Sequence, residues 1–155
     1  MNKKAVELLK SREFVSVATC DLKGRPNAAP KLLLKVENNF IYLVDYIIGR
    51  TFNNLEANPR VSISFMDNDT LTGYQINGAV ELIESGPEYD NLVKDIAQKE
   101  VDLSTRRIIE GVTKGKSHTG FELGLSESFV IFKVKVEEVV EIGSSGTLKT
   151  EKICE

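Results

Sequence analysis

The sequence predicts a mainly β fold with a few helices, and three features of its 155 residues carry this prediction. Residues 14–19 alternate apolar and small polar side chains, which is typical of a half-buried strand. The segments 40–44 and 129–136 are rich in aromatic and β-branched residues, which favour strands. Gly78 interrupts a further strand-like segment at 74–83, and such glycines mark the bulges and bends by which a sheet curves into a barrel.

Six strands are expected, with turns between them that the sequence marks clearly. Asp21 to Gly24 is a turn, because Asp and Gly favour the backbone conformations that turns need. A polar turn at 67–73 precedes the fifth strand. The expected strands are 14–19, 28–36, 40–44, 61–65, 74–83 and 129–136, and 137–142 extends or follows the last one after a kink.

Helices are expected to flank the strands. The N-terminal region 1–12 carries a short amphipathic helix, which packs on the barrel or, alternatively, binds a partner. An insert at 85–117 opens with a helix to about residue 99, because apolar residues recur there at helical spacing after the capping Ser85. A second short helix is expected within 101–112, followed by a flexible basic loop, and the insert as a whole is expected to cover a substrate opening.

Composition limits the class of protein. One domain over 1–155 is expected, with a flexible polar tail at 144–155. The net charge of −3 argues against nucleic acid as a partner, and no apolar run reaches the ~18 residues of a membrane span. Without a secretory signal pattern the expected location is cytoplasmic. The single His118 and the distant Cys20 and Cys154 exclude a multi-histidine metal site and a disulfide framework.

The segment from Arg50 to Pro59 is the most informative part of the chain. Thr51 is a good N-cap for a short helix, and Pro59 ends that helix because it disfavours the α conformation at Asn58. Free backbone N–H groups, a hydroxyl and a guanidinium then lie together at the helix start. This combination suits an anion such as a phosphate, and Lys31 on a neighbouring strand offers a second positive charge.

Several short motifs follow one another in a fixed order between residues 14 and 66. They are the turn Gly24-Arg25-Pro26-Asn27, the strand with Pro30-Lys31, the pair Arg50-Thr51, and Asn54-Leu55-x-x-Asn58-Pro59-Arg60-Val61. This ordered set resembles the pyridoxamine 5′-phosphate oxidase-like, FMN-binding split-barrel family. The likeness covers about half of the chain and continues more weakly through Gly78-Ala79 to Ile83.

The resemblance implies a six-stranded Greek-key split barrel with flanking helices that forms a homodimer, with FMN at the subunit interface. It implies that Arg50 neutralises the flavin phosphate and that Thr51 bonds it, while Lys31 bonds either the phosphate or flavin oxygens. Two roles stay open, since Asn54 contacts the phosphate or stabilises the helix, and Tyr46 stacks on the flavin ring or packs in the interface. The implied cofactor-binding residues are Pro30, Lys31, Leu32, Val44, Asp45, Tyr46, Arg50, Thr51, Asn54 and, more weakly, Gln75.

No catalytic constellation is present in the sequence. Asp67 and Asp69 fit turn chemistry, His118 stands alone, and no catalytic residue is assigned. A flavin carries its own redox chemistry, so this absence is compatible with an FMN-dependent oxidoreductase or electron carrier acting on a small molecule or redox partner. The chain lacks the C-terminal Arg- and His-bearing motif of true pyridoxamine 5′-phosphate oxidases and is more similar to small FMN-binding and flavin reductase-like members. A non-enzymatic module for a flavin, F420 or haem and a structural dimer are the alternatives.

Overall fold

The fold is a six-stranded antiparallel β-barrel with a further strand and three helices in the described part of the chain. The computed structural model describes residues 2–114 and 129–153. The elements are α1 (Lys3–Lys10), β1 (Phe14–Cys20), β2 (Pro26–Glu37), β3 (Phe40–Asp45), α2 (Arg50–Ala57), β4 (Arg60–Asp67), β5 (Thr72–Ile83), α3 (Pro87–Lys114), β6 (Val130–Ile142) and β7 (Leu148–Lys152). The split-barrel fold class expected from the sequence is therefore confirmed.

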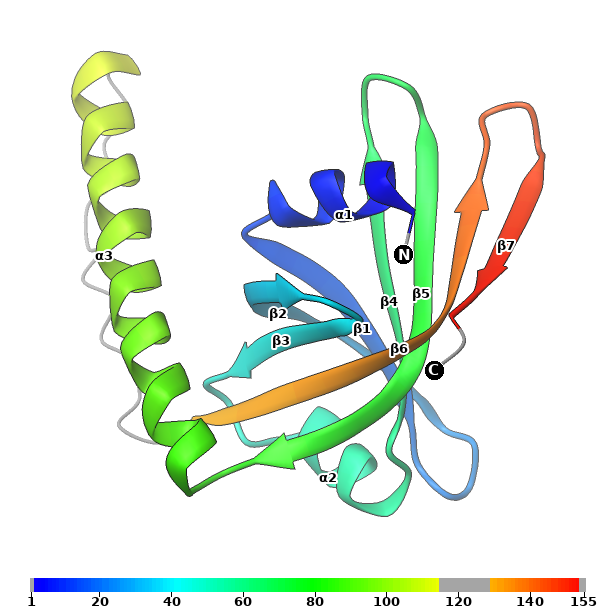
Figure 1. The fold of residues 1–155 in the computed structure, drawn as a ribbon, viewed down its shortest axis with the longest axis horizontal. Helices are drawn as coiled ribbons and strands as arrows, with labels where there is room; N and C mark the ends of the chain where they lie inside the picture. The colour runs from blue at the N-terminus through cyan, green and yellow to red at the C-terminus, as the bar shows by residue number, and fades with distance from the viewer. Residues whose placement is uncertain (1, 115–128, 154–155) are drawn as a thin grey trace.

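Strand β6 closes the barrel (Figure 1). The strands follow the order β3-β2-β1-β4-β5-β6-β7, and β6 pairs again with β3, so that residues 40–45 oppose 130–135. The second half of β6 stays paired with β5, while its other edge pairs with β7 in place of β3, from Glu138 to Ile142. One long strand thus joins three others.

The irregularity that the sequence predicts at Gly78 is present, and its extra residue, Glu137, lies on β6. The pairing of β5 with β6 shifts register between Asn77 and Gly78. A Cβ atom at residue 78 would lie only 2.2 Å from the carbonyl oxygen of Lys135, so only glycine lets the two backbones approach this closely.

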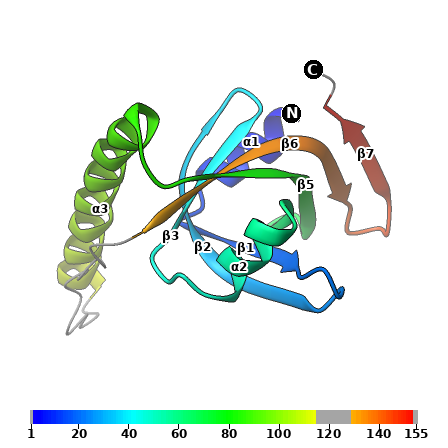
Figure 2. The same ribbon diagram turned by 90° about the horizontal axis from the view of Figure 1, so that it is seen from below.

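Two short helices lie at the two ends of the barrel (Figures 1 and 2). Helix α1 contributes Ala5 and Leu9 to the barrel core, and both side chains are fully buried. Helix α2 contributes Phe52 and Leu55 at the other end. Because a helix of eight residues is marginal alone, this apolar packing is what holds α2 in place.

Helix α3 lies against the outside of the barrel and covers a second apolar cluster. Leu32, Leu34 and Val44 of the barrel wall pack there against Leu92 and Ile96 of the helix. This arrangement explains the continuous apolar run Leu32-Leu33-Leu34 in β2. The outward side chains of Leu32 and Leu34 lie under a flanking helix, while Leu33 faces the core.

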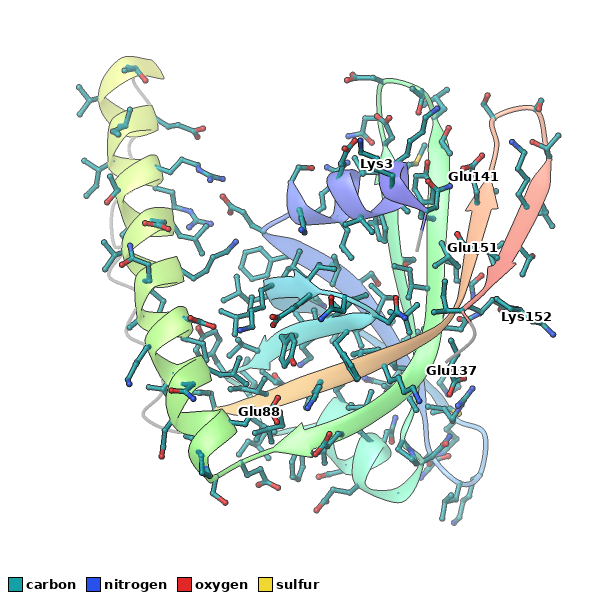
Figure 3. All side chains as sticks on the ribbon, in the orientation of Figure 1. Lys3, Glu88, Glu137, Glu141, Glu151 and Lys152 are labelled. Carbon is teal, nitrogen blue, oxygen red and sulfur yellow. The ribbon has the colours of Figure 1, made fainter. Side chains whose placement is uncertain are left out.

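Ion pairs add to this contact between α3 and the barrel. Glu88 lies at the start of α3 beside β6, where it pairs with Lys133 at 2.9 Å (Figure 3). Lys35 on β2 pairs with Asp95 at 2.7 Å. Both lysines also lie over aromatic rings, those of Phe40 and Tyr42 respectively.

Two expectations from the sequence are wrong in detail. One helix of 28 residues, Pro87–Lys114, replaces the two helices expected before and after residue 100, because nothing near that point breaks a helix. The segment 144–155 contains strand β7 at Leu148–Lys152 where a flexible tail was expected. The predicted loop at 115–117 lies outside the described residues, and none of the described helices is long and apolar enough to cross a membrane.

Candidate anion and cofactor site

Helix α2 begins one residue earlier than the sequence suggests, at Arg50. Gly49 is its N-cap, and no side chain of the described residues caps the helix start. Thr51, expected to be the cap, lies inside the first turn and is 4% exposed. Its Oγ1 accepts a hydrogen bond of 3.0 Å from Asn27 on β2. The correction matters because the first backbone N–H groups of α2 have no side-chain acceptor.

The helix is also bonded to β1. The buried amide of Asn54 donates to Thr19 Oγ1 at 3.0 Å, and Asn58 donates to the carbonyl oxygen of Cys20 at 3.3 Å. These bonds fix the position of α2 against the end of the β1–β2 hairpin. Asn54 thus anchors α2 to β1, and its contact with a phosphate stays a prediction.

A polar cavity of about 370 Å³ lies between the β1–β2 hairpin and α2. Arg50 is exposed at this cavity and has no hydrogen-bond or ion-pair partner among residues 2–114 and 129–153. The residues that line the cavity are Asp21, Arg25, Pro26, Arg50, Asn53 and Asn54. An unpaired guanidinium at an uncapped helix start is a suitable site for a phosphate or another anion.

The opposite side of the cavity is an ordered turn. Asp21 Oδ1 accepts 2.9 Å hydrogen bonds from the backbone N–H groups of Lys23 and Arg25, and Asp21 Oδ2 lies 2.6 Å from Nε of Arg25. The N–H and then the guanidinium of Arg25 lower the pKa of the Asp21 carboxyl. The sequence predicted this turn but not that Arg25 lines a cavity. The one available signal was that Arg25 directly precedes the strand that carries Pro30 and Lys31.

Lys31 and Asp45 form a buried ion pair with each other. Lys31 Nζ lies 2.6 Å from Asp45 Oδ1, and the two side chains are 8% and 3% exposed. The same oxygen accepts the backbone N–H of Ile47 at 3.2 Å, whereas Asp45 Oδ2 is buried and has no partner among the described residues. The ammonium group of Lys31 is therefore bonded to this carboxylate in the protomer.

The residues expected along the flavin ring lie near α3. Leu32 and Val44 are a cross-strand pair whose side chains are buried in the outer apolar cluster. Tyr46 is half-buried, contacts the ring of Phe129 edge-on at a centroid distance of 6.0 Å, and donates a 2.8 Å hydrogen bond to Glu100. Burial and this hydrogen bond raise the pKa of the Tyr46 phenol well above its ordinary value.

Two expected site residues lie on the outer surface of the sheet. Pro30 is exposed on β2, beyond the end of the outer cluster. Gln75 on β5 donates to Ser62 at 3.0 Å and to Asn77 at 3.1 Å. Strands β1 and β4 separate β5 from β2 in the sheet. The structure thus brings together Arg50, Thr51 and Asn54 but leaves Gln75 apart within one protomer.

Comparison with known proteins identifies the family. A model of the pyridoxamine 5′-phosphate oxidase family matches residues 1–142. The chain belongs to this family. A solved structure from Clostridium acetobutylicum, a protein related to general stress protein 26 and assigned to the pyridoxinephosphate oxidase family, has 18% identity and a TM-score of 0.69 over 97% of this chain and 92% of that one.

Other proteins similar to this chain are named for different cofactors. An FMN-binding protein of Nostoc punctiforme, described as related to pyridoxamine 5′-phosphate oxidase, has 14% identity and a TM-score of 0.60 over 98% of this chain and 94% of that one. The haem oxygenase HutZ of Vibrio cholerae is 33% identical over 64 residues, which are 41% of this chain and 36% of HutZ. The alignment therefore spans about a third of that curated relative.

Proposed function

We propose that this protein is an FMN-binding flavoprotein that transfers hydride or electrons through a flavin held between two copies of the chain. The observation that carries the proposal is the Arg50 guanidinium, which has no partner in the described part of the chain and lies at the start of α2 beside the polar cavity. Backbone N–H groups at a helix start and an arginine are the usual partners of a flavin phosphate. The residues present therefore suit the phosphate end of FMN.

Strand β2 gives the cofactor a direction. Its start contacts α2 through Asn27 and Thr51, and Pro30 follows three residues later, about 10 Å along the strand at ~3.4 Å per residue. This spacing leaves room for a ribityl chain between a phosphate at Arg50 and a ring at Pro30. When bound, FMN supplies the redox chemistry. Arg50 binds and neutralises the phosphate, and the hydrogen bond from Asn27 to Thr51 holds the helix start against β2.

A second copy of the chain is proposed to cover the outer face of β1 and β4. This face pairs Ser16 with Ser64 and Ala18 with Ser62, so small side chains dominate it. Phe14 and Met66 on the same face are 50% and 45% exposed. The outward residues are Phe14, Ser16 and Ala18 on β1 and Ser62, Ser64 and Met66 on β4. Small residues permit close approach of another sheet, and exposed apolar side chains favour it.

The dimer also gives Gln75 a role. Gln75 and Asn77 extend this outer face onto β5, and a cavity of about 640 Å³ opens there, lined among others by Ala18, Ser62 and Asn77. In a dimer formed through this face, Gln75 of one protomer approaches the flavin of the other. Its separation from Arg50 within one protomer is then expected.

Charge reversal at Arg50 tests the proposal. Arg50→Glu is expected to weaken FMN binding by roughly 100-fold, because a charge-assisted hydrogen bond is replaced by repulsion. The matched control is Lys10→Glu on α1, an exposed lysine at the other end of the barrel. Flavin fluorescence titration measures both. If wild-type protein does not bind FMN, or if Arg50→Glu binds it as well as the wild type, the proposal fails.

The similarity to HutZ favours haem binding as a second candidate function. The only histidine of the sequence, His118, lies outside the described residues. A thermal-shift screen with FMN, F420 and haemin separates the candidates. Stabilisation by haemin alone would replace the flavin proposal by a haem-binding one.

A further inference from the structure

The cavity beside Arg50 is larger than a phosphate group requires. Its volume of about 370 Å³ corresponds to roughly a dozen water molecules at ~30 Å³ each, whereas a phosphate has five heavy atoms. It falls within the ~300–1,000 Å³ of sites that hold whole small molecules. A phosphate bound to Arg50 therefore leaves most of the cavity to another part of the ligand.

The hairpin wall of the cavity is polar and held in place before a ligand arrives. Asp21 bonds Nε of Arg25 and is itself fixed by two backbone N–H groups of the same turn. The terminal nitrogens of Arg25 remain for other acceptors, and they form the donor pair that suits a phosphate or carboxylate. Asn53 on the α2 wall adds an exposed amide.

Arg25 and Arg50 come from different elements. Arg25 belongs to the hairpin and Arg50 to α2, so the cavity has a cation on each wall. Among residues 2–114 and 129–153, Arg25 has a carboxylate partner, Asp21, whereas Arg50 has none. A ligand with a single phosphate satisfies Arg50 and leaves the Arg25 side of the cavity to water.

We infer that this site also accepts flavins that continue beyond their phosphate, and that it binds them more tightly than FMN because a second anionic group pairs with Arg25. The inference rests on the proposed function, which places the first phosphate at Arg50. The shared chemistry is a phosphate substituted on both sides, through an anhydride in FAD and a second ester in F420, with a further negative charge beyond it. FAD offers a second phosphate there, and F420 offers the carboxylates of its tail.

Comparative titration tests this inference. FMN, FAD and F420 are titrated against the wild type, Arg25→Ala and the control Lys23→Ala. Lys23 lies in the same hairpin and its exposed side chain does not line the cavity, so its removal takes away one charge without the contact. FAD, F420 or both are expected to bind the wild type about tenfold more tightly than FMN. Arg25→Ala is expected to remove this advantage, and Lys23→Ala to keep it.

The outcomes separate the two proposals. The inference is overturned if FAD and F420 bind no more tightly than FMN, or if Arg25→Ala weakens all three ligands equally. FMN binding through Arg50 would then still stand. Failure of all three ligands to bind would overturn both proposals. Preference for FAD alone identifies a second phosphate, and preference for F420 alone identifies an acidic tail. Arg25→Lys, which keeps the charge, is expected to recover part of the preference, and circular dichroism checks that each variant is folded.

Discussion

Replacing Lys31 by methionine tests the role that the structure gives this residue. Its ammonium group lies 2.6 Å from Asp45, and both side chains are more than nine-tenths buried. Without Lys31, the Asp45 carboxylate keeps a single hydrogen bond, from Ile47 N–H, and its other oxygen has no partner among the described residues. Removing one partner of a buried ion pair leaves an uncompensated charge, so Lys31→Met is expected to lower the free energy of unfolding by about 3–5 kcal/mol.

The assay is urea denaturation of the apoprotein, supported by thermal melts. The expected loss corresponds to a Tm decrease of roughly 6–20 °C, at ~2–4 °C per kcal/mol for a chain of this size. The double variant Lys31→Met/Asp45→Leu removes both charges and is expected to regain most of the stability. Lys10→Met on α1 is the exposed control. A single variant within about 1 kcal/mol of the wild type, or a double variant no more stable than the single one, would refute the reasoning.

The same double variant asks whether Lys31 touches the cofactor. If the double variant is stable but binds FMN much more weakly than the wild type, Lys31 or Asp45 contacts the flavin directly. Unchanged affinity would limit the role of the pair to stabilising the barrel near the turn that precedes α2. The sequence-based assignment of Lys31 as a flavin contact thus has its own test.

Two further predictions follow from the backbone contact at β5 and from the contact of α3. Gly78→Ala is expected to destabilise the fold by about 3 kcal/mol or more in urea denaturation, because its Cβ would meet the carbonyl oxygen of Lys135 at 2.2 Å. Gly73→Ala is the control and should be nearly neutral, because the atom nearest to its Cβ would lie at 3.5 Å. Tyr46→Phe removes the hydrogen bond to Glu100 and is expected to cost about 1 kcal/mol. In an absorbance titration it should also remove a phenol that titrates above its ordinary range, and because that pKa is raised, the wild type loses this stabilisation as the pH rises above about 10. A Tyr46 phenol that titrates normally in the folded protein would contradict this prediction.

The sequence was sufficient for most of the barrel because its signals are local. Alternation in β1, the glycine within β5 and the turn at Asp21 are each visible in a few consecutive residues. Strand β7 gave no such signal, because all five of its residues are exposed and only its pairing with β6 holds it as a strand. The length of α3 was underestimated because the apolar spacing is weaker after residue 99, although no residue near that point breaks a helix and Ser104 is tolerated inside one.

The site was predictable in its components but not in its pairings. Arg50 was found from the helix start that follows it. The bond between Lys31 and Asp45 depends on the register in which β2 opposes β3, and no local pattern specifies that register. Arg25 was missed for a similar reason, since its place in the cavity depends on how α2 docks against the hairpin.

The double pairing of β6 has a consequence for how the protein is made. Until residues 130–142 leave the ribosome, β3 and β5 each lack a neighbour along one side, so the nascent chain carries an open sheet with two free edges. Such edges recruit strands from other molecules. Closure joins segments about 90 residues apart for β3, and contacts this distant in sequence form slowly. The synthesis of residues 84–142, from the end of β5 to the end of β6, is therefore the period in which this chain most needs protection from aggregation.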